Sequence, residues 1–205
     1  MFINYTLFHF CAVCRENIDL VWVLDQSGSV GRKNHRLALN FIREVHEFFE
    51  ISPDHTRVGM VTFSTSSRIE FDLSAASNSH EVENLVDSVS YRGGYTATAL
   101  ALLHTRLLFA SNTTGVRPQS DGIPRVAVLL TDGKSNLYHL GSIPQDLKDS
   151  GVVVYSVGIG NIELNELLDI SSDPDFLYVY LLESYTDARG FVDLMSATIC
   201  ECEYF

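Results

Sequence analysis

The chain has 205 residues, a length that predicts one domain, and 46% of them are hydrophobic, which excludes a disordered chain. The formal net charge of −12 argues against nucleic acid as a partner, because such binding needs Lys and Arg to neutralise phosphates. No apolar run approaches the roughly 20 residues that span a bilayer, so we expect no membrane insertion.

The first 17 residues form an N-terminal segment ahead of the predicted domain. Its opening run, MFINYTLFHFCAV, is apolar enough to suggest a signal peptide. However, it lacks a basic start, and Asn4, Thr6 and His9 interrupt it. A signal remnant and a linker therefore both stay open for residues 1–17. We place the domain at residues 18–199 and a short tail at 200–205.

The four cysteines lie only near the two ends of the chain: Cys11 and Cys14, then Cys200 and Cys202. This clustering is read most simply as a disulfide that ties the ends of one domain together. We predict a Cys14–Cys200 bridge, with Cys11 and Cys202 either paired or free. A zinc site built from all four is the alternative, whereas a thioredoxin-type redox pair is disfavoured because Cys11-x-x-Cys14 precedes a strand.

The stretch IDLVWVLDQSGSVG, residues 18–31, carries the main signal. It begins as a nearly unbroken apolar run, which predicts a strand buried on both faces of a parallel sheet. Asp25, Ser27 and Ser29 then place oxygen-bearing side chains at alternate positions. A carboxylate beside small hydroxyls suits a hard cation such as Mg²⁺.

Strands and helices are expected to alternate along the rest of the chain. Paired glycines at 93–94 predict a flexible loop that delivers Thr96 to the head of a helix, where helix capping is the alternative to a binding role. The pattern predicts helices at Lys33–Ile51, Ser79–Val89, Ala97–Ala110, Ile143–Ser150, Glu163–Ile170 and Tyr185–Ile199, and further strands at Thr56–Phe63, Arg68–Leu73, Arg125–Thr131, Val152–Gly160 and Phe176–Tyr180.

This order predicts an α/β fold with a doubly wound, mostly parallel six-stranded sheet, helices on both faces and one antiparallel edge strand. The antiparallel strand is Arg68–Leu73, because Ser64–Ser67 reads as a hairpin turn. In such folds, ligands bind beyond the carboxyl ends of the strands. Asp25, Thr96 and Asp132 should therefore meet at one rim, although each alone is as readily a turn or cap residue.

Asp25-x-Ser27-x-Ser29, Thr96 after Gly-Gly, and Asp132 in Leu-Thr-Asp-Gly resemble the metal-ion-dependent adhesion site of von Willebrand factor A domains. The resemblance runs from about Ile18 to Ile199, and the flanking cysteines are similar to those of matrilins and collagen-associated A domains. It implies a Rossmann-like fold and Mg²⁺ as the cofactor, with Mn²⁺ or Ca²⁺ as alternatives.

The resemblance also implies a role for each of the five site residues. Ser27, Ser29 and Thr96 would coordinate the ion directly, whereas Asp25 and Asp132 would hold it largely through water. A Glu or Asp carboxylate of a protein partner, such as collagen or another matrix protein, would complete the shell. Keeping both carboxylates at a distance leaves the cation more attractive to a third one.

Enzyme motifs are matched only in part. Asp25-Gln26-Ser27 resembles the nucleophile motif of haloacid-dehalogenase-type phosphatases, but Ser27 stands where a general acid is needed. His35, the nearest histidine, is expected on the solvent side of the following helix, so no nucleophile–base pair can be named. We expect no enzyme, with a metal-assisted phosphohydrolase as the less favoured alternative.

Tyr91, Arg92 and Tyr95 surround the glycine loop and are candidates for direct partner contact, because aromatic and Arg side chains often dominate interfaces. Asn112 and Asn4 lie in glycosylation sequons, which favour an extracellular location. We therefore expect a secreted adhesion or matrix module. An intracellular A domain that uses its metal to hold a partner subunit is the principal alternative.

Overall fold

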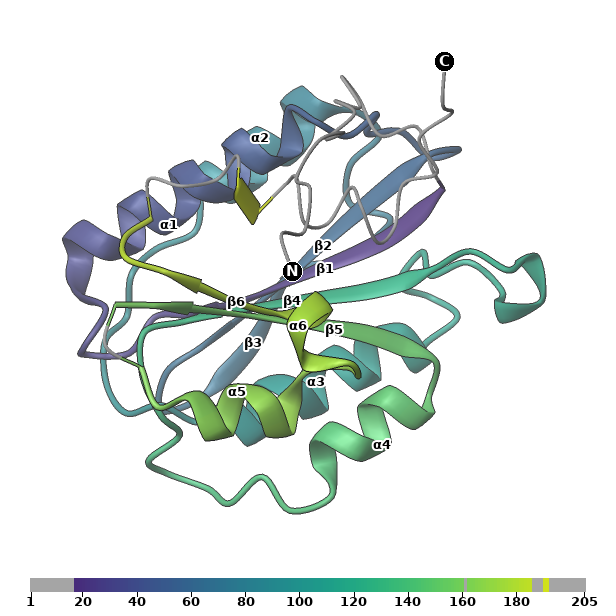
Figure 1. Cartoon of the computed structure of the whole chain (residues 1–205). Coiled ribbons are helices and arrows are strands. Elements are labelled where there is room, and N and C mark those ends of the chain that lie inside the picture. Colours follow the sequence, from purple (N-terminus) through teal and green to yellow (C-terminus); the bar gives the residue numbers. More distant parts are fainter. Residues whose placement is uncertain (1–16, 161, 186–189, 192–205) are drawn as a thin grey trace, which may run out of the picture.

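The computed structural model describes residues 17–160, 162–185 and 190–191, and it is built on one six-stranded sheet (Figure 1). The strand order is β3-β2-β1-β4-β5-β6. β2 and β3 pair antiparallel at one edge, and the other neighbours are parallel. This confirms the predicted fold class. The strands are β1 (Ile18–Asp25), β2 (Thr56–Phe63), β3 (Ser67–Phe71), β4 (Arg125–Thr131), β5 (Val152–Ile159) and β6 (Val179–Leu182).

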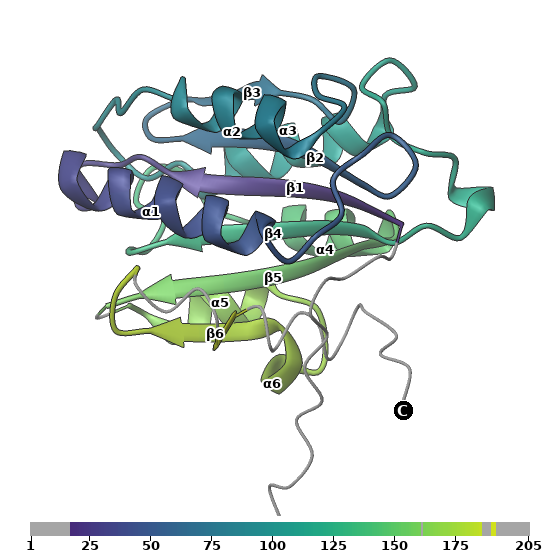
Figure 2. The ribbon, with the colours of Figure 1, turned by 90° about the horizontal axis from the view of Figure 1, so that it is seen from above.

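Helices cover both faces of the sheet. α1 and α2 lie on one face and α3, α4 and α5 on the other (Figures 1 and 2). A short 3₁₀ turn follows α3, and a single helical turn precedes β6. The helices are α1 (Gly31–His46), α2 (Ser79–Asp87), α3 (Thr98–Ala110), the 3₁₀ turn η1 (Gln119–Asp121), α4 (Ile143–Asp149), α5 (Leu164–Ile170) and α6 (Asp175–Tyr178).

Strand β1 runs through the centre of the sheet, and all eight of its residues are buried. Alternate side chains point to opposite faces of a strand. Leu20, Trp22 and Leu24 accordingly join the core beneath α1 and α2, whereas Val21 and Val23 join the core beneath α3 and α4. A strand that is apolar on both faces thus holds the middle of the molecule, as the unbroken run predicted.

Two predicted elements differ from the structure by three residues or more at one end. The first helix ends at His46, five residues before the predicted Ile51. The prediction was too long because Phe49 and Ile51 are buried in the same core while lying outside the helix. The predicted last strand was also wrong at its start: Phe176 lies in α6 and is 77% exposed, and the strand begins at Val179.

Several predictions fall on parts of the chain outside the described residues. These are most of the predicted helix Tyr185–Ile199, the sequon at Asn4, and the four cysteines Cys11, Cys14, Cys200 and Cys202. Asn112, in the other sequon, is exposed just after α3. Within the described part of the chain, the helices are too short or too polar to cross a bilayer.

Candidate metal centre

The predicted site lies where the strand order reverses. From β1 the sheet extends to β2 on one side and to β4 on the other, so the loops after β1 and β4 diverge and leave a crevice at their carboxyl ends. Asp25 is the last residue of β1 and Thr131 is the last residue of β4. The pairing of Leu24 with Leu130 places these two ends side by side, with Asp132 immediately beyond.

Four of the five predicted ligands are joined by short contacts. Asp25 accepts hydrogen bonds from the Ser27 amide at 2.7 Å and from the Thr131 hydroxyl at 2.6 Å. The Ser27 and Ser29 hydroxyl oxygens lie 3.0 Å apart, and the Ser29 hydroxyl donates to Asp132 Oδ1 at 2.8 Å. Ser29 and Asp132 are 103 residues apart in the chain, so the fold itself brings these oxygens together.

The fifth predicted ligand, Thr96, is buried and tied to the Asp132 loop through its backbone. Its amide donates to Asn136 Oδ1 at 2.8 Å, and its carbonyl accepts from the Asn136 amide at 3.0 Å and from the Ser135 hydroxyl at 3.2 Å. The alternative interpretation of Thr96 as a helix cap is wrong, because Ala97 occupies the N-cap position of α3.

The glycine loop around Gly93 and Gly94 is held against the turn that follows β1 by backbone hydrogen bonds. The Gly28 amide donates to Gly94 O at 2.8 Å, and the Gly93 amide donates to Gln26 O at 2.9 Å. Gly94 has a φ of +108°, and a Cβ there would lie 2.3 Å from Thr65 Oγ1. Only glycine fits this close approach, which sets the position of the segment leading to Thr96.

The charges of the site fit a bound cation. Burial, with a smaller contribution from nearby Asp132, raises the pKa of Asp25 to about 6, and burial also raises the pKa of Asp132. In the described part of the chain, no Lys or Arg forms an ion pair with either carboxylate. Two uncompensated carboxylates beside the Ser27 and Ser29 hydroxyls form a donor set that suits a hard divalent ion.

The donor set differs from a site made of acids, thiols or imidazoles alone. Among the residues that the structure describes, no three His, Cys, Asp or Glu side chains are grouped so as to hold a metal. Here hydroxyls supply the majority of the candidate ligands. The five residues therefore fit Mg²⁺-type coordination in which water and hydroxyls share the shell with few carboxylates.

Several supporting residues were not found by sequence reasoning. Gln26 is fully buried and connects two side chains. The Nε2 atom of Gln26 lies 3.0 Å from His35 Nε2, and the Arg92 guanidinium donates a hydrogen bond to Gln26 Oε1. His35 is only 4% exposed, so its predicted position on the solvent side was wrong. Glu166 accepts two hydrogen bonds from the Ser135 amide. These residues lack a motif, because their roles depend on which loops meet in space.

The three candidate contact residues, Tyr91, Arg92 and Tyr95, differ in their hydrogen bonds and in their exposure to solvent. The Tyr91 hydroxyl donates to Ser27 O at 3.1 Å, and the Arg92 guanidinium donates to Thr62 Oγ1 at 2.7 Å. Both side chains therefore brace the site from within. Tyr95 is 61% exposed, which makes it the most open of the three toward a partner.

Comparisons with known proteins identify relatives along almost the whole chain. The family model of the von Willebrand factor type A domain matches residues 19–194. Mouse matrilin-4 is 35% identical over 188 residues, which is 91% of this chain and 30% of that protein. The collagen alpha-1(XII) chain of Notophthalmus viridescens is 31% identical over 89% of this chain and 19% of its own length. This chain thus spans less than a third of these relatives.

Solved structures agree on the fold. Proximal thread matrix protein 1 from the mussel byssus superimposes with a TM-score of 0.80 at 24% identity, over 89% of this chain and 48% of that one. A second structure of the mussel protein, described as having a zinc-occupied MIDAS motif, has a TM-score of 0.77 at 27% identity, over 89% of this chain and 46% of that one.

Proposed function

Because the chain belongs to the von Willebrand factor type A domain family, we propose that it is a metal-dependent, non-enzymatic protein-binding module of the extracellular matrix. The observation that carries this proposal is the chain of contacts from Ser27 through Ser29 to Asp132, beside the buried Asp25. The likeness to a matrilin and to a collagen chain supports the matrix setting and secretion. The mussel structure with an occupied motif supports a divalent ion.

In this proposal each oxygen has a separate task. Ser27, Ser29 and Thr96 offer neutral hydroxyls to Mg²⁺, with Mn²⁺ or Ca²⁺ as alternatives, whereas Asp25 and Asp132 act largely through water. The bound cation supplies an open position for a carboxylate of the ligand. Hydroxyls leave most of the ionic charge uncompensated, so a Glu or Asp of a matrix protein such as collagen is attracted strongly.

The acidity of the chain makes the metal decisive for binding. With a net charge of −12 and two carboxylates at the rim, the metal-free site repels an acidic ligand. A divalent ion reverses the sign of the local field. Ligand binding should therefore depend on metal in an all-or-none manner, which is the behaviour of a switchable adhesion site.

The test is Mg²⁺ titration by calorimetry on the wild type and on Asp25→Ala. We expect the variant to lose about 10- to 100-fold in Mg²⁺ affinity, the usual cost of removing a group that orients a metal site. Binding to a matrix protein extract should be lost both in this variant and in EDTA. Mn²⁺ and Ca²⁺ titrations would rank the alternative ions.

Asp54→Ala is the matched control. This substitution also replaces a carboxylate by alanine, but Asp54 is exposed and lies before β2, at the opposite end of the sheet. We expect its Mg²⁺ affinity to equal that of the wild type. Equal affinities for Asp25→Ala and Asp54→Ala, or matrix binding that persists in EDTA, would contradict the proposed function.

A further inference from the structure

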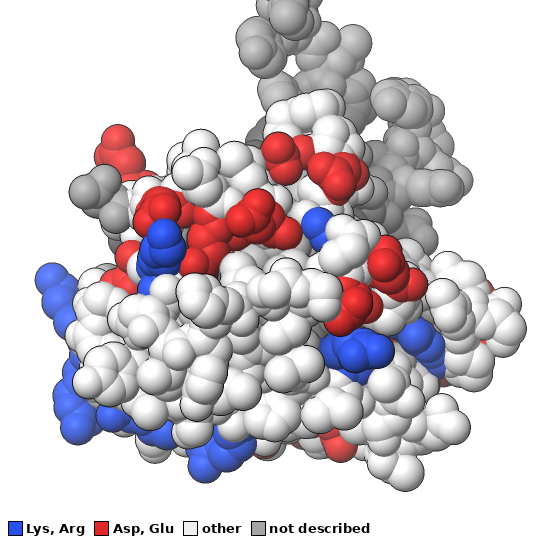
Figure 3. All heavy atoms as spheres, turned by 90° about the horizontal axis from the view of Figure 1, so that it is seen from below, with Lys and Arg blue, Asp and Glu red and all other residues white. Residues whose placement is uncertain are grey.

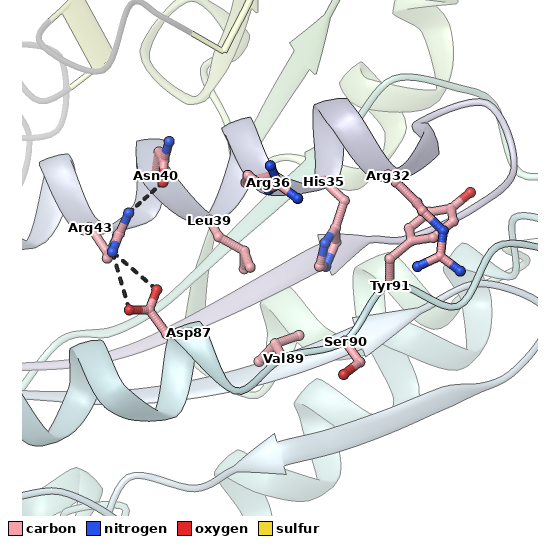
Figure 4. A pocket seen from close by; sticks show the side chains of 10 residues that line it. All are labelled: Arg32, His35, Arg36, Leu39, Asn40, Arg43, Asp87, Val89, Ser90 and Tyr91. Carbon is pink, nitrogen blue, oxygen red and sulfur yellow. Dashed lines mark hydrogen bonds and ion pairs between the residues drawn. The ribbon is translucent and has the colours of Figure 1, made fainter.

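A hollow of about 470 Å³ lies beside the candidate metal centre, between α1 and the segment that follows α2 (Figure 4). We call it the α1 groove. Arg32, Arg36 and Arg43 line it from α1, and Asp87, Val89 and Tyr91 line it from the other side. Leu39 also lines it and, like Val89, is a largely buried apolar side chain. The groove therefore combines guanidinium groups with apolar surface.

The positive charge of this groove is unusual for the molecule. Of the 14 Lys and Arg residues in the chain, four lie in α1, namely Arg32, Lys33, Arg36 and Arg43. On the opposite face of the sheet, by contrast, Asp and Glu side chains gather over part of the surface formed by α3, α4 and α5 (Figure 3). The basic side chains thus concentrate next to the metal centre in an otherwise acidic protein.

The first turns of α1 carry this charge at an electrostatic cost. Its first turn has no acidic residue, and basic side chains there oppose the positive end of the helix dipole. Arg43 is neutralised by Asp87, 3.1 Å away. Within the described residues, neither Arg32 nor Arg36 forms an ion pair. Local rules of stability are often broken at functional sites, where an outside partner compensates.

The groove is continuous with the metal centre. The Arg32 guanidinium lies over the Tyr91 ring, 5.4 Å from its centroid, and the Tyr91 hydroxyl donates to the backbone of Ser27. α1 itself begins two residues after Ser29. Arg36 is seven residues beyond Ser29, which corresponds to about 10 Å along a helix axis. A ligand held at the metal can therefore reach the groove.

We infer that the α1 groove binds a second acidic residue of the same ligand protein, whose first carboxylate is held at the metal centre. This inference rests on the proposed function and adds to it a requirement on the ligand. An extended peptide advances about 3.3 Å per residue, so side chains about 10 Å apart are about three positions apart in its sequence. The recognised segment therefore carries two acids with about two residues between them.

The composition of the groove favours an acidic peptide over a sulfated polysaccharide. Guanidinium groups pair with carboxylates in a two-pronged geometry. Leu39 and Val89 line the groove and offer apolar contact to peptide side chains. Arg43 is already paired with Asp87, so Arg32 and Arg36 alone can meet an anion, which suits one carboxylate better than a polymer with an anionic group on every sugar. The α1 groove therefore suits a ligand with one well-placed charge and some apolar surface.

The experiment measures binding to immobilised poly-L-glutamate, with Mg²⁺ and with EDTA, for the wild type, Arg36→Glu and Arg106→Glu. Arg36 and Arg106 are both exposed arginines, but Arg106 lies on α3, on the other side of the sheet. With Mg²⁺ we expect Arg36→Glu to lose at least tenfold in affinity and Arg106→Glu to stay within twofold of the wild type. Urea unfolding checks that both variants are folded.

Soluble peptides then test the spacing. A glycine peptide with two Glu separated by two residues should compete at least fivefold better than the same peptide with one Glu replaced by Gln. This advantage should vanish for Arg36→Glu. Equal competition by the two peptides on the wild type would overturn the inference.

The remaining outcomes separate the inference from the function beneath it. Equal losses in Arg36→Glu and Arg106→Glu, with binding still abolished by EDTA, overturn the groove and leave the metal site standing. Binding that is lost in Arg36→Glu but insensitive to EDTA contradicts the metal-dependent function instead. Binding of heparin in place of poly-L-glutamate would show that the groove takes a sulfated polysaccharide and would overturn the peptide assignment.

Discussion

Strand β1 carries a buried aspartate near each end, and only one of the two is paired with a positively charged side chain. Asp19 and Asp25 are both fully buried. Asp19 accepts hydrogen bonds from the Arg117 backbone amide at 2.7 Å and from its guanidinium Nε at 2.8 Å. Asp25 accepts only neutral donors, from Ser27 and Thr131, and burial raises its pKa to about 6.

The difference separates a structural charge from a functional one. A buried carboxylate is costly unless it is paired. The pair with Arg117 lies at the amino ends of the parallel strands, where it ties the segment after α3 to β1. Asp25 lies at the carboxyl ends, where ligands bind in such sheets. A buried charge without a partner in the protein thus marks the position that an external cation is expected to fill.

Removing the internal partner should have the largest effect on stability. Arg117→Ala leaves Asp19 buried without a cation, and we expect the free energy of unfolding to fall by about 3–5 kcal/mol. Both side chains are at most 8% exposed, so solvent cannot compensate. Urea unfolding at pH 7.5 measures the loss.

A double variant distinguishes the charge from the packing. Asp19→Asn combined with Arg117→Met removes both charges and keeps an oxygen that can accept the hydrogen bond of the residue 117 amide. We expect it to recover at least half of the lost stability. If Arg117→Ala costs no more than Arg106→Ala, a change at an exposed position, the pair at this end of β1 has no structural role and the comparison fails.

The middle of β1 provides a pH-dependent test. The Trp22 indole donates to His46 Nε2 at 2.8 Å, and complete burial lowers the pKa of His46 to about 3. The unfolded chain therefore binds a proton near pH 6.5 that the folded chain excludes. Stability is complete above pH 6.5 and decreases as pH falls toward 3, by about 1.4 kcal/mol per pH unit.

The histidine contribution is isolated by comparison with His46→Gln, whose amide oxygen can accept the indole hydrogen bond. Between pH 7.5 and 4.5 the wild type should lose about 2–3 kcal/mol more than this variant. Urea unfolding at the two pH values gives the double difference. Identical pH dependence in the two proteins would show that His46 takes up its proton in the folded state.

At the carboxyl end of β1, removing the charge should stabilise the metal-free protein. The pKa of Asp25 rises from 3.8 to about 6 on folding, so its ionised form opposes folding above pH 6 and the penalty fades as pH falls toward 3.8. In EDTA at pH 7.5, we expect Asp25→Asn to gain about 2 kcal/mol in the free energy of unfolding. Asparagine keeps one oxygen for the hydrogen bond of the Ser27 amide, and its NH₂ group can donate to the Thr131 hydroxyl, which in turn can donate to Gly133 O.

Magnesium provides the control for this prediction. Mg²⁺ should raise the stability of the wild type, because a ligand that binds only the folded state stabilises it. At the same Mg²⁺ concentration, Asp25→Asn should gain less stability, because its Mg²⁺ affinity is lower. A less stable Asp25→Asn in EDTA would mean that this carboxylate, like Asp19, has a structural role.

The same contrast explains which features could be predicted from the sequence. The bounds of β2 and β4 matched, and β1 starts at Ile18 like the predicted apolar run, because each strand is an apolar run closed by turn residues. Asp25, Ser27 and Ser29 could be singled out because they directly follow such a run. The 111–124 segment is polar and carries Gly, Pro and Asn, which is typical of a surface loop, and yet Arg117 within it is buried. Its partner Asp19 is 98 residues away, and no local pattern reports that contact.

The supporting contacts of the site could not be predicted from the sequence for a similar reason. Asn136 is an exposed residue in a polar loop, and such residues are common in any sequence. Its role arises only because the loop after β4 meets the loop before α3. Predicting it requires the three-dimensional arrangement, whereas the ligands themselves are marked by their chemistry and by their place after a strand.

The smallest predicted effect concerns Asn136, which we regard as a positioning residue for Thr96. Asn136→Ala removes the acceptor of the buried Thr96 amide and should cost about 1 kcal/mol of stability. Because this contact orients a candidate ligand, Mg²⁺ affinity should also fall, by about three- to tenfold. Asn84→Ala, at an exposed site on α2, should change neither quantity.

Asn136→Asp separates positioning from general stability, because it keeps the oxygen that accepts the Thr96 amide hydrogen. We expect its Mg²⁺ affinity to return at least to the wild-type value, with the added charge favouring the cation. If Asn136→Ala lowers stability but binds Mg²⁺ as well as Asn84→Ala does, Thr96 is held without this contact. Mg²⁺ affinity would then depend only on the turn after β1 and on Asp132, so the functional site would be limited to residues that follow β1 and β4.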